Sequence, residues 1–215
     1  MRIIRVEHGG TSYYGILEDG LVFRLHQQPV HMEPIPLSEA KVLPLVTPSK
    51  VVCVGLNYKA HAEELGYPLP NMPSFFLKPP SSIIGNGEPI VLPSGMGRIE
   101  HEAELAMVVG KVCRNLTPEE AEESLFGFTC ANDVTAREVQ KVDPLIGHCK
   151  SYDTFCPIGP WIETELEDIN DLSIRCLVNG EVRQSANTGD MIFRPLDLLC
   201  FLSRVMTLMP GDVIL

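Results

Sequence analysis

The segment that most constrains the fold is an apolar run that follows two closely spaced glutamates. Leu105–Val109 is apolar throughout and Gly110 ends it, which is typical of a β-strand entering a hydrophobic core. Side chains alternate along a strand, so Glu102 and Glu104 are predicted to point to the same face, side by side. Two like charges beside apolar residues repel each other and lose solvation, so a positive group is expected between them.

A hard divalent cation is the simplest positive group for this position. Carboxylate oxygens suit Mg²⁺, Mn²⁺ or Ca²⁺. The alternative is a solvated strand end that carries two ordinary surface glutamates. The segment alone leaves both interpretations open.

Composition limits the class of protein. A chain of 215 residues can bury one full core with a small appended domain. The formal net charge of −11 argues against a nucleic-acid partner, because phosphates require a basic surface. The seven cysteines are scattered without a CxxC pair, as is typical of reduced thiols in a cytoplasmic protein. No apolar segment resembles a signal peptide or is long enough to span a bilayer, so we expect no membrane partner.

The N-terminal region is predicted to form a small β domain. Its three short strands are separated by glycine-containing turns. Prolines between residues 29 and 50 predict an extended connector. We therefore predict an N-terminal β domain with its proline-rich linker over residues 1–45 and a main domain over residues 46–215. The three strands are expected at Arg2–His8, Ser12–Leu17 and Leu21–His26.

A histidine and a glutamate lie three residues apart in a predicted helix that Gly66 ends. At this spacing His61 and Glu64 can touch. A carboxylate that holds one imidazole nitrogen strengthens the other nitrogen as a base. The alternative is an exposed helical ion pair that stabilises by only a few tenths of a kcal/mol. The spacing alone favours this alternative.

A third acidic residue follows the predicted strand Leu125–Ala131. Thr135 and Glu138 predict a capping box, so Asp133 should lie just before a helix. Asp133 could complete a three-carboxylate site, and it could equally serve as a helix cap.

Two lysines could face such a site. Lys78 lies where an apolar segment gives way to a loop, so it can reach an anionic ligand or extend its stem along the surface. Lys150 lies in a loop rich in polar residues and could supply the positive charge that a carboxylate site needs.

Three further elements are predicted from local signals. Thr117 and Glu120 form a capping box for a helix that begins at Pro118. Asn179-Gly180 predicts a type I′ hairpin between strands at 172–178 and 181–184, followed by a polar loop to residue 193. Another helix is expected from Pro195.

Several short motifs resemble, in the same order, those of the fumarylacetoacetate hydrolase family. The likeness covers residues 51–215, and the first 50 residues resemble the variable N-terminal region of bacterial members. It implies an α+β, mostly β fold: a mixed β-roll with short helices, preceded by a small N-terminal β domain, usually in a homodimer. Besides the paired glutamates, the motifs are Asn57-Tyr58-x-x-His61-x-x-Glu64, Phe76-Leu77-Lys78-Pro79, Asp133-x-Thr135-Ala136-Arg137-Glu138-x-Gln140, Lys150–Phe155, Gly159-Pro160-Trp161 and Asn187–Phe193.

The resemblance implies a metal site and a catalytic dyad. Glu102, Glu104 and Asp133 match the family's ligands for Mg²⁺ or Mn²⁺, with Ca²⁺ as an alternative. His61 and Glu64 match its catalytic dyad, on a segment that orders when substrate binds.

It also implies a pocket beside the metal. Lys150 matches the catalytic lysine next to the metal. The positions that match the lining of the substrate pocket are Lys78, Arg137, Gln140 and Thr188.

The implied activity is metal-dependent hydrolysis of a C–C bond in acylpyruvate-type 2-oxo acids. His61, oriented by Glu64, would take a proton from water, and pyruvate would leave as an enolate that the metal and Lys150 stabilise. The alternatives are oxaloacetate decarboxylation or keto–enol tautomerisation, and isomerisation of 2-hydroxyhepta-2,4-diene-1,7-dioate (a hydroxymuconate-type diacid). They use the same enolate without an attacking water. A further alternative is a non-catalytic protein that binds metal and a 2-oxo acid.

One departure from the family pattern concerns the C-terminus. The family continues beyond Gly211-Asp212-Val213-Ile214-Leu215 with a Gly-Thr-Pro-x-Gly-Val-Gly segment and another strand pair. We therefore expect this sequence to lack a C-terminal part. A molecule ending at Leu215 would expose a strand edge and lack part of the pocket.

Overall fold

The structure is a computed structural model that describes residues 1–25 and 33–215. Most of its strands belong to one twelve-stranded mixed sheet. In chain order these strands are β1 (Arg2–His8), β2 (Thr11–Glu18), β3 (Leu21–Arg24), β4 (Ile35–Pro36), β5 (Lys41–Val42), β6 (Val51–Gly55), β7 (Ser74–Lys78), β8 (Ile83–Ile84), β10 (Ala103–Val109), β11 (Leu125–Asn132), β13 (Cys156–Glu163) and β16 (Val213–Ile214).

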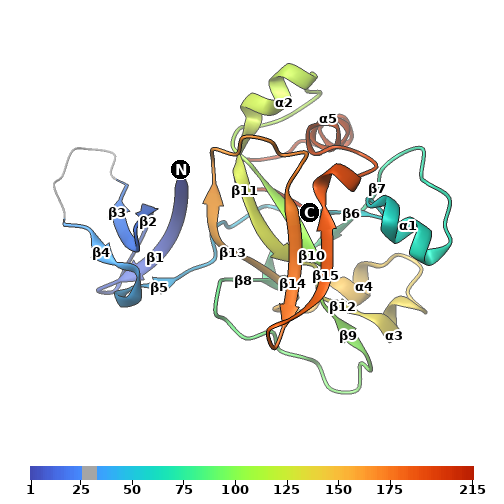
Figure 1. Ribbon diagram of the computed structural model, residues 1–215, viewed down its shortest axis with the longest axis horizontal. Helices are drawn as coiled ribbons and strands as arrows, with labels where there is room; N and C mark the ends of the chain where they lie inside the picture. Colours follow the sequence, from blue (N-terminus) through green and yellow to red (C-terminus); the bar gives the residue numbers. More distant parts are fainter. Residues whose placement is uncertain (26–32) are drawn as a thin grey trace.

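The sheet runs through the whole molecule in the order β4-β3-β2-β1-β13-β11-β10-β16-β6-β7, with β5 beside β1 and β8 beside β13. Two small sheets, β9 (Ile99–Glu100) with β12 (Thr135–Ala136) and β14 (Ser173–Val178) with β15 (Glu181–Asn187), lie outside it. Figure 1 shows the N-terminal strands at one end of the molecule and the helices around the other. This arrangement confirms the predicted α+β, mostly β class.

The helices are short. The α-helices are α1 (Lys59–Leu65), α2 (Pro118–Ser124), α3 (Arg137–Gln140), α4 (Gly147–Lys150) and α5 (Pro195–Val205), and the 3₁₀ turns are η1 (Leu37–Glu39), η2 (Pro80–Ser82) and η3 (Thr188–Asp190). Within the described residues, no helix is long and apolar enough to cross a membrane.

The three predicted N-terminal strands are present, and the third ends at Arg24. Its predicted end at His26 lies outside the described residues. The connector is less open than predicted, because β4 pairs with β3 and β5 pairs with β1. Since β1 also pairs with β13, the N-terminal strands continue into the main sheet. The division at residue 45 stays a prediction.

Alternation along β10 explains why the sheet has an apolar core on each face. Ala106 and Val108 are buried in one cluster, whereas Met107 and Val109 are buried in a second cluster with the apolar side of α5. Glu104 has the parity of Ala106, so the strand directs its side chain toward the first face.

The prediction that one strand carries both Glu102 and Glu104 is wrong in its first half. β9 ends at Glu100 and β10 begins at Ala103, so His101 and Glu102 lie between two strands. The break has a long-range cause: β9 pairs with β12, whereas β10 pairs with β11.

One of the two predicted capping boxes is present. Thr117 and Glu120 exchange side-chain and backbone hydrogen bonds at the start of α2. The box predicted for Thr135 and Glu138 is wrong, because Thr135 lies in β12 and its hydroxyl donates to the carbonyl of Asp133. The helix there begins only at Arg137.

The predicted type I′ hairpin is confirmed. Asn179 and Gly180 both have positive φ, at 52° and 81°, and join β14 to β15. The polar loop predicted from Ser185 is wrong in its first part, because β15 continues to Asn187 and η3 follows. The helix expected from Pro195 is α5.

Asp212 joins the start of β16 to the segment before β6 through a buried carboxylate. Its Oδ1 accepts hydrogen bonds from the backbone N–H groups of Ser49 and Lys50 and from the Ser49 hydroxyl. Its Oδ2 accepts from the Met209 N–H and lies 2.5 Å from Lys50 Nζ. Burial alone would raise the pKa of Asp212, but these donors hold it below its usual value.

We expect Asp212→Ala to lower the free energy of unfolding by about 3 kcal/mol at pH 7, because it leaves buried donors and a lysine without their partner. A carboxyl with a depressed folded pKa stabilises above its unfolded pKa of about 3.9, and this contribution is lost as pH falls through the folded pKa. Urea unfolding at pH 7 and pH 3 should therefore show a smaller difference from wild type at pH 3. Glu181→Ala, which removes only an exposed ion pair with Arg183, should change stability by less than about 1 kcal/mol. Equal losses in both variants would contradict this account.

Candidate active site

A buried ion-pair cluster surrounds the start of β10 and the end of β11. Lys150 Nζ lies 2.5 Å from Glu102 Oε2 and 2.7 Å from Asp133 Oδ2. Lys78 Nζ lies 2.6 Å from the other carboxylate oxygen of Asp133. Lys78, Asp133 and Lys150 are each at most 3% exposed. Four residues that the sequence marked as candidates therefore meet in one place.

Neighbouring elements hold these four side chains together. Lys78 is the last residue of β7, and Asp133 follows β11, where its N–H donates to the Glu102 carbonyl. Lys150 ends α4, and its ammonium lies 5.3 Å from the centre of the Phe76 ring. Lys78 does not extend to solvent as the alternative interpretation required.

The charges in this cluster support one another. Burial alone would lower the pKa of Lys150, but the negative charges of Asp133 and Glu102 raise it above its usual value. Lys150 is therefore a cation held between two carboxylates.

Arg137 extends the cluster to a second glutamate. Its Nη2 lies 2.7 Å from Glu102 Oε1, and its Nε donates to Glu100 Oε2 over 2.6 Å. Its Nη1 donates to Gln140 Oε1, so the two residues predicted to line a pocket touch each other. Sequence reasoning missed Glu100, although its spacing of two from Glu102 was a usable signal.

Glu104 differs from the other acids in the cluster. Within the described residues, no hydrogen bond or ion pair holds its carboxylate. Burial raises the pKa of Glu104 well above its usual value, and the charges of Glu102 and Asp133 raise it further against the opposing effect of Lys150. The three predicted metal ligands thus interact electrostatically, and Glu104 is the member without a cation.

As they stand, no three His, Cys, Asp or Glu side chains in the described ranges are grouped to hold a metal ion. The ammonium groups of Lys78 and Lys150 contact oxygens of Asp133 and Glu102 instead. The donor chemistry nevertheless fits a hard divalent cation, because three carboxylates lie near one another and Glu104 has no hydrogen-bond or ion-pair partner among the described residues. Their assignment as ligands stays a prediction.

The predicted dyad is present as a contact. His61 Nδ1 lies 3.3 Å from Glu64 Oε2 on α1, and the two side chains are 50% and 77% exposed. No hydrogen bond or ion pair between described residues links either side chain to the cluster. The catalytic role of the dyad therefore stays a prediction.

Asn57 fixes the base of the helix that carries the dyad. Its carboxamide accepts from the Phe193 N–H and donates to the Phe193 carbonyl, over 2.9 and 3.0 Å. Its own carbonyl accepts from the Ile192 N–H. Sequence reasoning included Asn57 in a motif but missed this anchoring role.

Thr188 is buried at the base of the β14–β15 hairpin. Its Oγ1 accepts from the Leu172 N–H over 2.8 Å, and its own N–H donates to the Leu172 carbonyl. The hydroxyl predicted to line the substrate pocket thus holds the hairpin closed.

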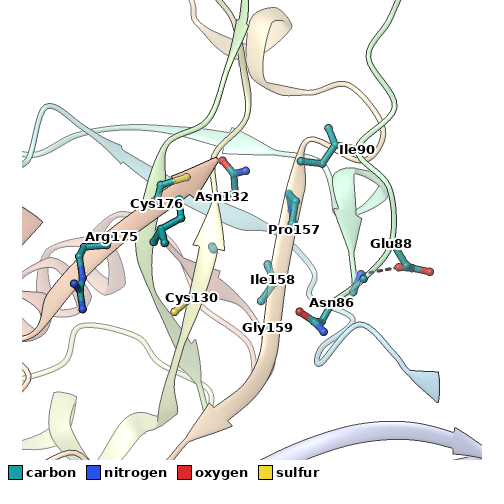
Figure 2. A pocket seen from close by; sticks show the side chains of 15 residues that line it. Asn86, Glu88, Ile90, Cys130, Asn132, Pro157, Ile158, Gly159, Arg175 and Cys176 are labelled. Carbon is teal, nitrogen blue, oxygen red and sulfur yellow. Dashed lines mark hydrogen bonds between the residues drawn. The ribbon is translucent and has the colours of Figure 1, made fainter. Parts of the chain in front are cut away.

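A groove of about 340 Å³ lies beside the cluster. It runs between the ends of β11 and β13, the loop that includes Asn86 and Glu88, and strand β14. Figure 2 shows Asn132 and Cys176 near one another on one wall and Pro157 and Ile158 on another. None of the ten predicted site residues lines this groove.

Comparisons with known proteins agree with this fold. The family model for the fumarylacetoacetate (FAA) hydrolase C-terminal region matches residues 50–215, and a Rv2993c-like N-terminal model matches residues 1–44. The chain belongs to the fumarylacetoacetate hydrolase family, whose members are enzymes.

Three similar proteins show the range of activities. The 5-carboxymethyl-2-hydroxymuconate delta-isomerase of Mycobacterium smegmatis is 40% identical, with a TM-score of 0.90, and the match covers 100% of this chain and 86% of that one. The maleylpyruvate hydrolase of Sphingobium sp. SYK-6, solved with manganese(II) and pyruvate, is 31% identical, with a TM-score of 0.82 and coverage of 100% and 87%. The human mitochondrial oxaloacetate tautomerase FAHD2A is 43% identical over 84% of this chain and 59% of its own length.

We expect Glu104→Gln to change stability in opposite directions with and without a divalent cation. In EDTA the variant should be more stable than wild type by about 1 kcal/mol, because it removes the charge of a partly buried acid that has two negative neighbours. With 5 mM Mn²⁺ wild type should gain melting temperature, whereas the variant should gain less because it has lost a ligand.

The exposed substitution Glu181→Gln serves as the control and should behave like wild type in both buffers. Equal gains in wild type and Glu104→Gln would contradict the assignment of Glu104 as a ligand.

Proposed function

We propose that this chain catalyses the metal-dependent hydrolysis of a C–C bond in acylpyruvate-type 2-oxo acids, through an enolate. The charge balance of the cluster supports this proposal. Each of three acids contacts two cations, whereas Glu104 has no cation partner among the described residues. Four cations and these three acids leave one positive charge, which an ionised Glu104 balances, so a divalent cation would bring two positive charges that suit the carboxylate and the developing enolate of a 2-oxo acid. The cations are Lys78, Arg98, Arg137 and Lys150, and the acids are Glu100, Glu102 and Asp133.

The chain's own residues supply the remaining functions. Lys150 and Lys78 place buried ammonium groups where negative charge develops on the substrate. His61, oriented by Glu64, takes a proton from the attacking water. Glu102, Glu104 and Asp133 would hold Mg²⁺ or Mn²⁺, which would supply Lewis acidity when bound. Arg137 and Gln140 form a polar side of the pocket, and Thr188 holds the hairpin beside it.

Keto–enol tautomerisation of oxaloacetate is the second candidate. The 43% identity to a named oxaloacetate tautomerase favours it, and the structural likeness to a hydroxymuconate isomerase favours a related double-bond isomerisation. These reactions, and oxaloacetate decarboxylation, need the same enolate and no attacking water. A protein that binds metal and a 2-oxo acid without turnover is the remaining alternative. A homodimer and a cytoplasmic location belong to the same proposal.

We expect the protein to consume acetylpyruvate when Mg²⁺ or Mn²⁺ is present and to stop when EDTA is added. The enol absorbance should fall, with pyruvate and acetate formed in equal amounts. His61→Ala should lower kcat by at least about 100-fold, because general-base catalysis contributes about that much.

His8→Ala is the matched control, because His8 lies in β1, which β13, β11, β10 and β16 separate from β6, the strand before the dyad, and it should leave kcat unchanged. Loss of oxaloacetate enol without any acetylpyruvate cleavage would assign the chain to the tautomerases instead. Binding of oxalate with no turnover of either substrate would indicate the non-catalytic alternative.

A further inference from the structure

The side chain of Gln184 forms two hydrogen bonds with the backbone of Ala103, between the paired glutamates, and this pair of bonds is called the clamp below. Ala103 N–H donates to Gln184 Oε1 over 2.8 Å, and Gln184 Nε2 donates to the Ala103 carbonyl over 3.0 Å. Both backbone groups of one residue are therefore satisfied by one carboxamide, 81 positions away in the chain. Ala103 lies between Glu102 and Glu104, so this clamp acts on the segment that carries two predicted ligands.

The clamp makes the hydrogen bonds that a neighbouring strand would otherwise make with the first residue of β10. On one edge β10 pairs with β11 along its length, and on the other it pairs with β16 at Met107 and Val108. Near its start, the second edge of β10 meets the β14–β15 hairpin through Gln184. Figure 1 shows this hairpin lying across β10. A buried backbone donor and acceptor without such a partner would each cost about 1–3 kcal/mol.

A β-bulge in the β14–β15 hairpin determines the direction in which the Gln184 side chain points. Cys176 pairs with Gln184, but the next residue, Leu177, pairs with Val182. Arg183 is therefore an extra residue, a β-bulge that changes which face of the ladder the following side chains occupy. The bulge turns Gln184 toward β10, and Arg183 stays exposed.

We propose that Gln184 is a positioning residue that sets the relative orientation of the Glu102 and Glu104 carboxylates for a divalent cation. The inference rests on the proposed function, because it concerns the same site. Glu102 has a second anchor: its N–H donates to the Asn132 side chain and its carbonyl accepts from the Asp133 N–H. Gln184 fixes the next residue, so rotation about Ala103 is blocked between the two ligands. Groups that orient metal ligands typically change metal affinity about 10- to 100-fold when removed.

The test compares Mn²⁺ binding in wild type, Gln184→Met and Gln184→Asn, followed by the electron paramagnetic resonance signal of free Mn²⁺. Methionine keeps the size of the side chain but makes neither hydrogen bond, and asparagine keeps the carboxamide but is one methylene too short. Both variants should bind Mn²⁺ about 10- to 100-fold more weakly. Amide hydrogen exchange at Ala103 should be faster in both. Ser185→Ala, which alters an exposed neighbour on β15, should match wild type in both measurements.

The outcomes separate this inference from the proposed function. Faster exchange at Ala103 with unchanged Mn²⁺ affinity in a folded variant overturns the positioning role and leaves a merely structural clamp. If Gln184→Met does not fold, the decision rests on Gln184→Asn. Absence of Mn²⁺ binding in wild type overturns the proposed function and the inference together. Mn²⁺ binding that weakens in both variants, with acetylpyruvate left uncleaved by wild type, supports the positioning role while the hydrolase proposal fails.

Discussion

The arrangement of the site depends on Asp133 being shared between two buried lysines. Each carboxylate oxygen of Asp133 contacts a different ammonium group, Lys78 on one side and Lys150 on the other. An unpaired charge in such a place costs several kcal/mol, so each of the three residues requires the others. The pairing ties the end of β7, the residues after β11 and the end of α4 to one point, although they are far apart in the sequence.

This pairing also bears on the predicted cation site. In the cluster four positive groups contact three of the acids, and Glu104 has two negative neighbours and, among the described residues, no ion-pair partner. With Glu104 ionised, the four acids and four cations balance in formal charge without a metal. Such a balance lets the cluster fold without a metal, and Glu104 is the carboxylate predicted to bind a hard cation.

Several elements could be predicted from the sequence because their signals are local. The apolar run Leu105–Val109, the turn at Asn179-Gly180 and the capping box at Thr117 depend on neighbours within a few residues. The break at Glu102 could not be predicted in this way, since it arises from pairing between β9 and β12. The position of Thr135 in β12, where it caps no helix, has the same long-range origin.

The site shows a similar division. The paired carboxylates Glu102 and Glu104 predict a positive group nearby, and in the structure Lys150 contacts Glu102. No local pattern places Gln184 near Ala103, because the contact depends on an extra residue in one hairpin and on an unpaired edge of β10. The periodicity of a sequence does not reveal a side chain that makes the hydrogen bonds of an absent neighbouring strand.

The hairpin that carries Gln184 continues through Thr188 to the segment that Asn57 holds. One stretch of chain therefore contacts both the start of β10 and the base of the helix that carries His61. The relative placement of the predicted metal ligands and the predicted dyad therefore depends on this connection.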